Sequence, residues 1–399
     1  MRSSGDEWAL NAPDLTADGG MYCRGARVDG GLNIYGATIG STLDLTEARL
    51  SNLGGMALRA PGITVRFDMS CAGCAAAGTV DLFGAQIGGQ LWLGSAQLSS
   101  EGPDWALNAP LLKVGGGMYC NNGFSAAGGV NLFGAAIGST LEFAGATLSN
   151  PGTALRAPGC TVEADMTFTE GFSATGSIDL SDARIRGQLY LADATFTDSA
   201  ADLRNSDIRV LYGEPSSWPD VIYLNEMAYT VIEPYLAARQ WLRWLQRDPD
   251  GYQPQPYEQL AAYYRRVGHD EQARTVLLAK QRHRRQRLRL PARAWGHLQD
   301  TVIGYGYRPA RAFGWLILLL AFTTAYFTVS PPQAAAPGNP QFQPLIYAFD
   351  TVIPVVNLAH EQTYVLIGAG QWVTWLVSIA GWVLATTVVA GITRILMRS

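Results

Sequence analysis

A five-residue motif recurs four times in the first half of the chain. It reads Ala-Leu-Asn/Arg-Ala-Pro and occupies residues 9–13, 57–61, 106–110 and 154–158, in steps of 48, 49 and 48 residues. A fixed period of this length indicates a solenoid, in which each repeat packs only on its neighbours. We therefore expect about half of the protein to be a stacked rod, a form that usually binds or supports rather than catalyses.

A shorter step of 11 residues lies inside each repeat. Leu32-Asn33-Ile34 recurs as Leu43-Asp44-Leu45, and each triplet alternates apolar, polar and apolar side chains, which is typical of a short half-buried strand. The chain has 44 glycines, concentrated before residue 200, and these disfavour helix. We predict a β-helix over 8–212, made of about four 48-residue repeats, with Ala and Gly at its corners. A worn fifth copy at 203–205 indicates the capping end.

All five cysteines lie in the predicted solenoid, and Cys23, Cys71 and Cys120 occupy the same repeat position. If each repeat makes two coils, these residues lie roughly 9–10 Å apart, because neighbouring strands are ~4.8 Å apart. That distance is too long for a disulfide. We predict buried, small apolar side chains. Cys71-x-x-Cys74 is also compatible with a redox or metal pair, the less favoured interpretation because no second pair or nearby histidine accompanies it.

Catalytic patterns are missing from the sequence of the solenoid. It has no histidine, no Gly-x-Ser-x-Gly and no phosphate-binding loop, so we predict no cofactor and no metal, and expect a protein that is not an enzyme. Four acidic residues are expected to face solvent singly: Asp68, Glu142, Glu163 and Asp165. Four aromatic residues either line a binding face or, as we favour, pack along edges: Trp92, Trp105, Tyr119 and Phe133.

The middle of the chain has a helical composition over 216–300. Residues 233–246 carry an apolar face at helical spacing, and 257–274 resemble one tetratricopeptide-like helical hairpin. We predict a helical linker that ends in a basic segment. This segment is expected to contact anionic lipid headgroups, with a solvated charged face as the alternative and no nucleic-acid partner. Its residues are Lys280, Arg282, Arg284, Arg285, Arg287 and Arg289.

The last part of the chain, 310–397, predicts a transmembrane hairpin. Two apolar segments, about 312–329 and 372–397, are long enough to cross a bilayer. Gly381 and Ala385 in the second either permit close helix packing or are ordinary small residues of a helix, and the sequence favours neither. The connecting 331–371 has no Lys or Arg, so both termini are expected in the cytoplasm of an inner (plasma) membrane protein with several spans. The unpaired cysteines agree with a cytoplasmic solenoid.

A short apolar run between the two predicted spans, about 344–358, is too short to cross and too apolar for an open loop. A re-entrant or interfacial segment is expected. The layout resembles the pore module of two-span potassium channels, but no Thr-Val-Gly-Tyr-Gly filter follows the run. The ionisable Asp350 is the candidate pore residue, with Thr351, Pro354 and Asn357 beside it. The alternative is that Asp350 only caps a helix or is solvated.

Two resemblances bear on function. Residues 8–200 resemble the squared coils of pentapeptide-repeat β-helices, which implies a right-handed coil. Most of the chain resembles a group of actinobacterial proteins labelled membrane-associated oxidoreductases, on the Leu-Arg-Ala-Pro motif, Tyr-Gly-Tyr-Arg-Pro at 305–309 and the run 349–358. The label implies redox chemistry, yet no pattern that would cradle a flavin or nicotinamide is present.

Three functions follow from these patterns. The favoured one is a non-enzymatic membrane protein that presents the solenoid as a scaffold to a cytoplasmic protein partner. The second is a pore or channel-like effector, which requires a homo-oligomer because two spans cannot enclose a pore. The third is the oxidoreductase that the label implies.

Overall fold

The computed structural model describes residues 8–101, 105–286, 309–334, 342–353, 364–365 and 368–396. The chain divides into two compact units, Met1–Leu277 and Leu278–Ser399. The first unit contains the solenoid and the helical segment that follows it up to residue 277, and the second contains the apolar helices.

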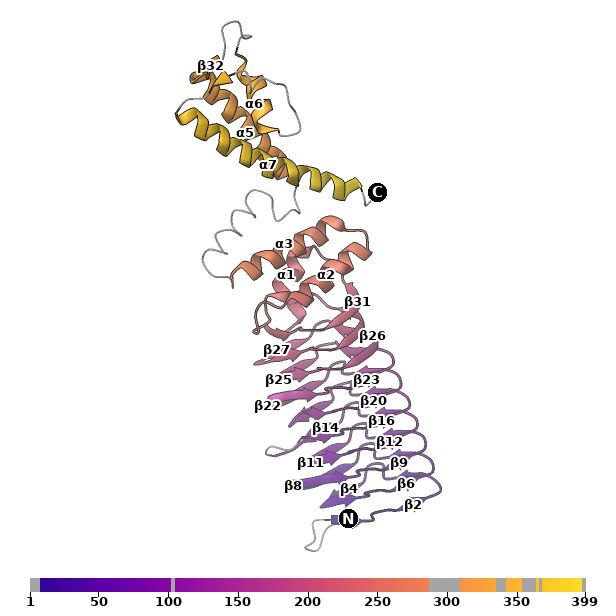
Figure 1. Ribbon diagram of the computed structural model, residues 1–399. Helices are drawn as coiled ribbons and strands as arrows, with labels where there is room; N and C mark the ends of the chain where they lie inside the picture. Colours follow the sequence, from indigo (N-terminus) through magenta and orange to yellow (C-terminus); the bar gives the residue numbers. More distant parts are fainter. Residues whose placement is uncertain are drawn as a thin grey trace. The chain divides into compact units, whose positions relative to one another are not determined.

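The first unit is a β-solenoid of about ten turns, drawn in Figure 1 as a stack of coils. Parallel pairs join each coil to the next: β3 (Met21–Tyr22) pairs with β7 (Leu43–Asp44), which pairs with β10 (Met69–Ser70), which pairs with β13 (Leu91–Trp92). The paired residues are 22, 26 and 22 positions apart, so two coils make one 48-residue repeat. The predicted β-helix is confirmed.

The strands form two long parallel sheets along the stack. One sheet holds β1 (Trp8–Asn11), β4 (Arg27–Asp29), β5 (Gly31–Asn33), β8 (Arg49–Arg59), β11 (Ala75–Asp81), β14 (Gln97–Ser99), β15 (Leu107–Asn108), β18 (Ser125–Ala127), β19 (Val130–Asn131), β22 (Thr147–Arg156), β25 (Ser173–Asp179), β27 (Thr195–Thr197), β28 (Ala200–Asp202) and β30 (Val221–Tyr223). The other holds β3, β7, β10, β13, β2 (Thr16–Ala17), β6 (Thr38–Ile39), β9 (Thr64–Val65), β12 (Gln86–Ile87), β16 (Lys113–Val114), β17 (Met118–Tyr119), β20 (Ala136–Ile137), β21 (Leu141–Glu142), β23 (Thr161–Val162), β24 (Met166–Phe168), β26 (Arg184–Leu191), β29 (Asp207–Tyr212) and β31 (Ala228–Glu233).

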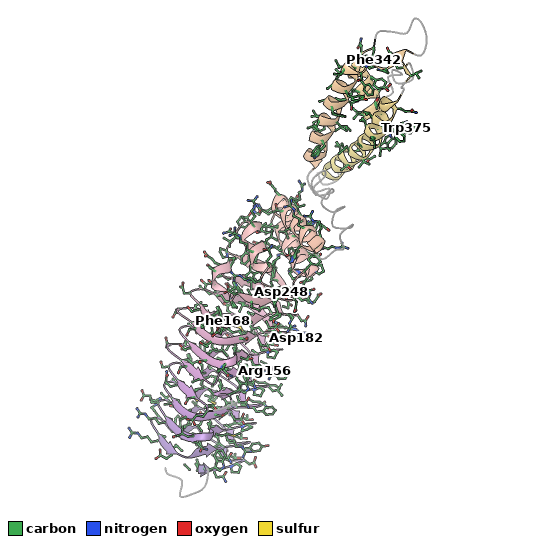
Figure 2. The ribbon with its side chains drawn as sticks, turned by 90° about the vertical axis from the view of Figure 1, so that its left-hand side faces the viewer. Arg156, Phe168, Asp182, Asp248, Phe342 and Trp375 are labelled. Carbon is green, nitrogen blue, oxygen red and sulfur yellow. The ribbon has the colours of Figure 1, made fainter. Side chains whose placement is uncertain are left out.

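The core consists of apolar side chains stacked in columns inside the coils. Successive strand side chains point to opposite faces, so every second residue of each short strand enters the core. One coil contributes eight such residues, all buried: Leu32, Ile34, Ala37, Ile39, Leu43, Leu45, Ala48 and Leu50. Farther along, Phe143 stacks on Phe168 with ring centroids 5.4 Å apart, and Figure 2 shows Phe168 among the coils. The predicted interior, with alanine near the corners and larger apolar side chains between them, is confirmed.

Three of the five cysteines alternate with leucines along one column of the core. Backbone hydrogen bonds place Cys23, Leu45, Cys71 and Leu93 in successive coils, so equivalent cysteines are two coils apart. All five cysteines are free, and all but Cys23 are buried. The prediction of packed, unpaired thiols is confirmed. Burial raises the pKa of Cys74 to about 12, which keeps this thiol protonated and unreactive near neutral pH.

The solenoid extends beyond the end that the repeat predicts. Strands β30 and β31 continue the parallel pairing from β28 and β29, so the last coil ends at Glu233 rather than near 212. The Ala-Leu-Asn/Arg-Ala-Pro motif is lost there, but inward apolar residues persist, with Ile222 and Ile232 buried. A further coil forms wherever apolar side chains keep pointing inward, whether or not the five-residue motif is present.

Three helices follow the last coil: α1 (Ala238–Leu245), α2 (Pro254–Arg266) and α3 (Asp270–Gln286). Figure 1 shows α1 and α2 at the end of the coil stack, and Figure 2 labels Asp248 at the junction. There, the Asp248 carboxylate accepts a hydrogen bond of 3.3 Å from the backbone N–H of Leu224. The predicted helical hairpin is present in α2 and α3, with Gly268 at positive φ between them.

The second unit is built around α5 (Pro309–Val329), α6 (Pro344–Val352) and α7 (Ala369–Leu396), with a short antiparallel pair of β32 (Gln333–Ala334) and β33 (Tyr364–Val365). The short helix α6 contacts both long helices. Among the described helices, only α7 is long and apolar enough to cross a bilayer, over Gly370–Val389, judged by length and composition. The apolar part of α5, Phe313–Val329, is shorter, so the two-span hairpin is not confirmed and the multi-pass location loses its support.

Candidate functional site

The predicted pore residues fall partly on α6. Thr351 is buried, and its hydroxyl donates a hydrogen bond of 2.8 Å to the carbonyl oxygen of Tyr347, one turn earlier. Asp350 is half-buried on the same helix. Pro354 and Asn357 lie outside the described residues. The structure therefore gives Thr351 an intrahelical hydrogen bond, and the pore role of these four residues stays a prediction.

Helix α6 is held between its neighbours by aromatic contacts and by a glycine. Phe327 of α5 meets Tyr347 in a T-shaped contact with ring centroids 4.8 Å apart. A Cβ atom at Gly381 of α7 would overlap the carbonyl oxygen of Val352, the last residue of α6. Close helix packing at Gly381 is therefore present, and its partner is the end of the short helix.

The predicted lipid-contact residues lie on the second half of α3, as far as they are described. At 100° per residue, Lys280 and Arg284 lie on one side of the helix, while Arg282 and Arg285 point to other sides. Arg287 and Arg289 lie outside the described residues. The four described cations are therefore spread over about 200° of the circumference of the helix and leave the remaining side without a cation.

Two of the four acidic residues predicted to face solvent accept hydrogen bonds from the backbone of the next coil. A carboxylate oxygen of Asp68 accepts the backbone N–H of Gln90, and Asp165 accepts that of Gln188, both at 2.7 Å. The two pairs are 97 or 98 residues apart, which is two full repeats. The expectation that all the acidic residues point singly to solvent is wrong here, because a corner carboxylate can satisfy the N–H of the next coil.

A polar ladder runs along one corner of the coils. Register pairs connect Asn11 to Asn33, Asn33 to Arg59 and Arg59 to Asp81. The same ladder continues through Asn108, Asn131 and Arg156. Hydrogen bonds link its members, from Asn33 to Asn11 at 2.6 Å and from Asn108 to Asp81 at 3.1 Å. Partial burial raises the pKa of Asp81, against the effect of these hydrogen bonds.

The polar ladder also fixes the residues two positions later. The side chains of Asn33, Asp81 and Asn131 accept the backbone N–H groups of Tyr35, Phe83 and Phe133, at 3.2–3.3 Å. Such side-chain turns hold the backbone at each corner in one conformation. The three aromatic residues are large and exposed, at 46%, 48% and 42% of their surface.

Prolines alternate with these aromatic residues. Backbone hydrogen bonds between successive coils place the residues at one corner, where they form a single column that we call the Pro/aromatic stripe. Its members are Pro13, Tyr35, Pro61, Phe83, Pro110, Phe133 and Pro158. Sequence reasoning singled out Phe133 and, at the end of the repeated motif, the four prolines, but it did not connect them, because prolines and aromatic residues lie in alternate coils. Aligning the sequence coil by coil is the signal that would have found it.

Another column carries Trp92 and Tyr119, which stack with centroids 4.4 Å apart. A shallow groove of about 590 Å³ runs beside Trp92, between Asp44 and Asn121. Partial burial raises the pKa of Asp44, but hydrogen bonds from Thr46 and the ion pair with Arg24 outweigh it and bring the pKa below its usual value. The groove is open and lined mainly by polar side chains, and Arg24 and Asp44 within it pair with each other at 2.9 Å.

No group of three or more His, Cys, Asp or Glu side chains is placed to hold a metal ion in the part of the chain that the structure describes. Comparison with protein-family models, with curated proteins and with solved structures found no match to this chain. The resemblance to the actinobacterial group therefore stays a prediction, and the function must be argued from the surfaces described above.

Proposed function

We propose that this protein is a non-enzymatic scaffold that presents the surface of its β-solenoid for binding and is anchored to a membrane by its C-terminal helices. The observation that carries the proposal is the Pro/aromatic stripe, in which exposed aromatic side chains held in fixed positions by the polar ladder alternate with prolines that are mostly half-buried. Exposed apolar stripes of this kind mark interaction sites. The core behind the stripe is filled, so the surface is rigid and needs little reordering to bind.

The anchor in this proposal is α7. The outward Ile379 and Val383 lie in Gly370–Val389 and are strongly exposed, as expected of side chains that face lipid. The basic residues at the end of α3 add contact with anionic headgroups, because basic side chains close to a membrane anchor are attracted to anionic lipids. The cytoplasmic side remains our proposal for the solenoid, on the charge asymmetry of the sequence.

Alkaline carbonate extraction of membranes tests the anchor. We expect the full chain to stay in the membrane pellet and the double variant Ile379→Arg, Val383→Arg to be released, because each arginine costs about 2.5–3.5 kcal/mol at the centre of a spanning helix. Val267→Arg, at the exposed end of α2, is the matched control and should stay in the pellet. Release of the unmodified chain would refute a spanning α7.

The alternative function is an oligomeric pore, which the position of α6 between α5 and α7 favours. This function also requires α5 to cross the membrane and several copies to assemble. The mass of the full chain in nanodiscs separates the two functions. A closed ring of four or more copies, with ion flux altered by Asp350→Asn, would support the pore, and a monomer or dimer would remove it.

A further inference from the structure

The Pro/aromatic stripe has a regular spacing that constrains its ligand. Neighbouring coils are ~4.8 Å apart, so Tyr35, Phe83 and Phe133 recur about every 9.6 Å. Between them lie Pro61 and Pro110, whose rings reach less far from the backbone than an aromatic ring. Pro61 and Pro110 are half-buried between these exposed aromatic residues, and we call their two positions, again about 9.6 Å apart, the notches of the stripe.

This spacing matches one class of peptide conformation. A polyproline II helix has three residues per turn and rises about 3.1 Å per residue, so one of its edges repeats about every 9.3 Å. Proline-rich peptides in this conformation dock on surfaces lined by aromatic side chains, and they lose little entropy on binding because the helix is already formed. A Pro-x-x-Pro segment would place its two prolines in the two notches.

Positive charges beside the first and last aromatic residues of the stripe add a second constraint. The guanidinium group of Arg59 lies 5.5 Å from the ring centroid of Tyr35, and that of Arg156, labelled in Figure 2, lies 5.0 Å from that of Phe133. In the polar ladder the two arginines are four coils apart, about 19 Å. A polyproline II helix covers that distance in about six residues.

We propose that the stripe binds a proline-rich peptide in the polyproline II conformation, with two prolines three residues apart and carboxylates about six residues apart. The proposal rests on the scaffold function above and names the ligand of that scaffold. The prolines occupy the notches at Pro61 and Pro110, Phe83 separates them, and the carboxylates pair with Arg59 and Arg156.

The probe is a fluorescent peptide, Asp-Ala-Pro-Ala-Ala-Pro-Asp, titrated with the full chain in nanodiscs and followed by fluorescence anisotropy. We expect saturable binding, and a loss of about tenfold or more in affinity for Phe83→Ala, the central aromatic residue. Phe67→Ala is the matched control, because Phe67 is equally exposed on another corner, and it should bind as the unmodified chain does. Circular dichroism confirms that both variants keep the solenoid.

A charge exchange tests the same surface without removing an aromatic residue. Arg156→Glu should weaken binding of the aspartate peptide and strengthen binding of the matched peptide Lys-Ala-Pro-Ala-Ala-Pro-Lys. This experiment tests the proposal even if Phe83→Ala does not fold. Replacement of both prolines of the probe by alanine should abolish binding, because the polyproline II preference and the notch contacts are both lost.

Three results would overturn the inference. They are no binding of the probe at about 1 mM, equal loss of affinity in Phe83→Ala and Phe67→Ala, or binding of a linear oligosaccharide to the stripe in place of the peptide. Membrane retention is measured on the same preparation. A chain that stays in membranes and ignores the peptide refutes the ligand alone, whereas a chain released by carbonate refutes the proposed anchoring.

Discussion

The hydroxyl of Tyr263, on α2, donates a hydrogen bond of 3.0 Å to the backbone carbonyl oxygen of Ile232, on the last strand of the solenoid. Gln255 and Gln259 make equivalent bonds to the carbonyl oxygens of Met227 and Tyr229, at 2.8 and 2.6 Å. A terminal coil presents carbonyl groups that no further strand can bind, and such edges favour aggregation. Side chains of α2 therefore replace the missing coil, and the helices cap the solenoid besides linking it to the second unit.

Removing one of these bonds should destabilise the capped end. Tyr263→Phe leaves the Ile232 carbonyl without its donor, and we expect the free energy of unfolding to fall by about 1 kcal/mol. Urea unfolding followed by circular dichroism measures the change. Tyr22→Phe is the control, because Tyr22 is exposed on the first coil, and it should have no effect. An unchanged stability of Tyr263→Phe would show that water satisfies this edge equally well.

The solenoid was predictable because each coil is stabilised by the same burial of inward side chains. Every coil must bury the same inward positions, so the apolar–polar–apolar pattern of Leu32-Asn33-Ile34 recurs in the sequence and indicates the fold. The end of the solenoid was not predictable from the motif. Ile222 and Ile232 keep the inward positions, but the capping contacts from α2 are made between residues about 30 positions apart, which no local pattern reveals.

The candidate site was predicted less well, for a related reason. Asp350 and the basic end of α3 attracted attention as charges beside apolar sequence, whereas Tyr35 and Phe83 look like ordinary surface residues in the sequence. Only the parallel register brings them into one column with prolines between them. The 48-residue period relates Tyr35 to Phe83, but successive coils are 22 and 26 residues long, so no fixed step places the prolines between them.

Packing inside the coils predicts a strong dependence on the aromatic cluster. Phe143→Ala removes a fully buried ring that stacks on Phe168, and we expect a loss of about 3–5 kcal/mol in the free energy of unfolding. Phe67→Ala removes the same atoms from an exposed position and should cost less than about 1 kcal/mol. Equal losses for the two variants, measured by urea unfolding, would contradict the described core.

Buried thiols should make stability depend on pH above neutrality. The pKa of Cys74 and that of Cys160 are raised from 9.0 to about 12, mainly by burial. Between these values the unfolded chain loses the thiol protons and the folded chain keeps them, so rising pH favours unfolding. The contribution is fully present below about pH 9 and is lost as the pH approaches 12.

The matching experiment compares urea unfolding at pH 8 and pH 10 for the unmodified chain and for Cys74→Ala, Cys160→Ala. We expect the decrease in stability between the two pH values to be smaller in the variant by about 1 kcal/mol for each thiol removed. Buried tyrosines such as Tyr229 titrate in both proteins and cancel in the comparison. An identical pH dependence would show that the two thiols are accessible to hydroxide in the folded chain.

The contact between Gly381 and Val352 predicts that the position of α6 requires glycine, with no Cβ atom, at residue 381. Gly381→Ala places a Cβ atom where the Val352 carbonyl oxygen lies, and this oxygen is backbone and cannot rotate away. We expect α6 to shift, at a cost of about 1–3 kcal/mol, with a lower melting temperature in detergent and a weaker near-ultraviolet dichroism signal from Tyr347 and its neighbours. Gly314→Ala on α5 is the control, because an added Cβ there meets no atom within 4 Å and alanine favours helix. If the two variants melt alike, α6 does not pack against α7 as described, and the argument for a pore built on that packing fails with it.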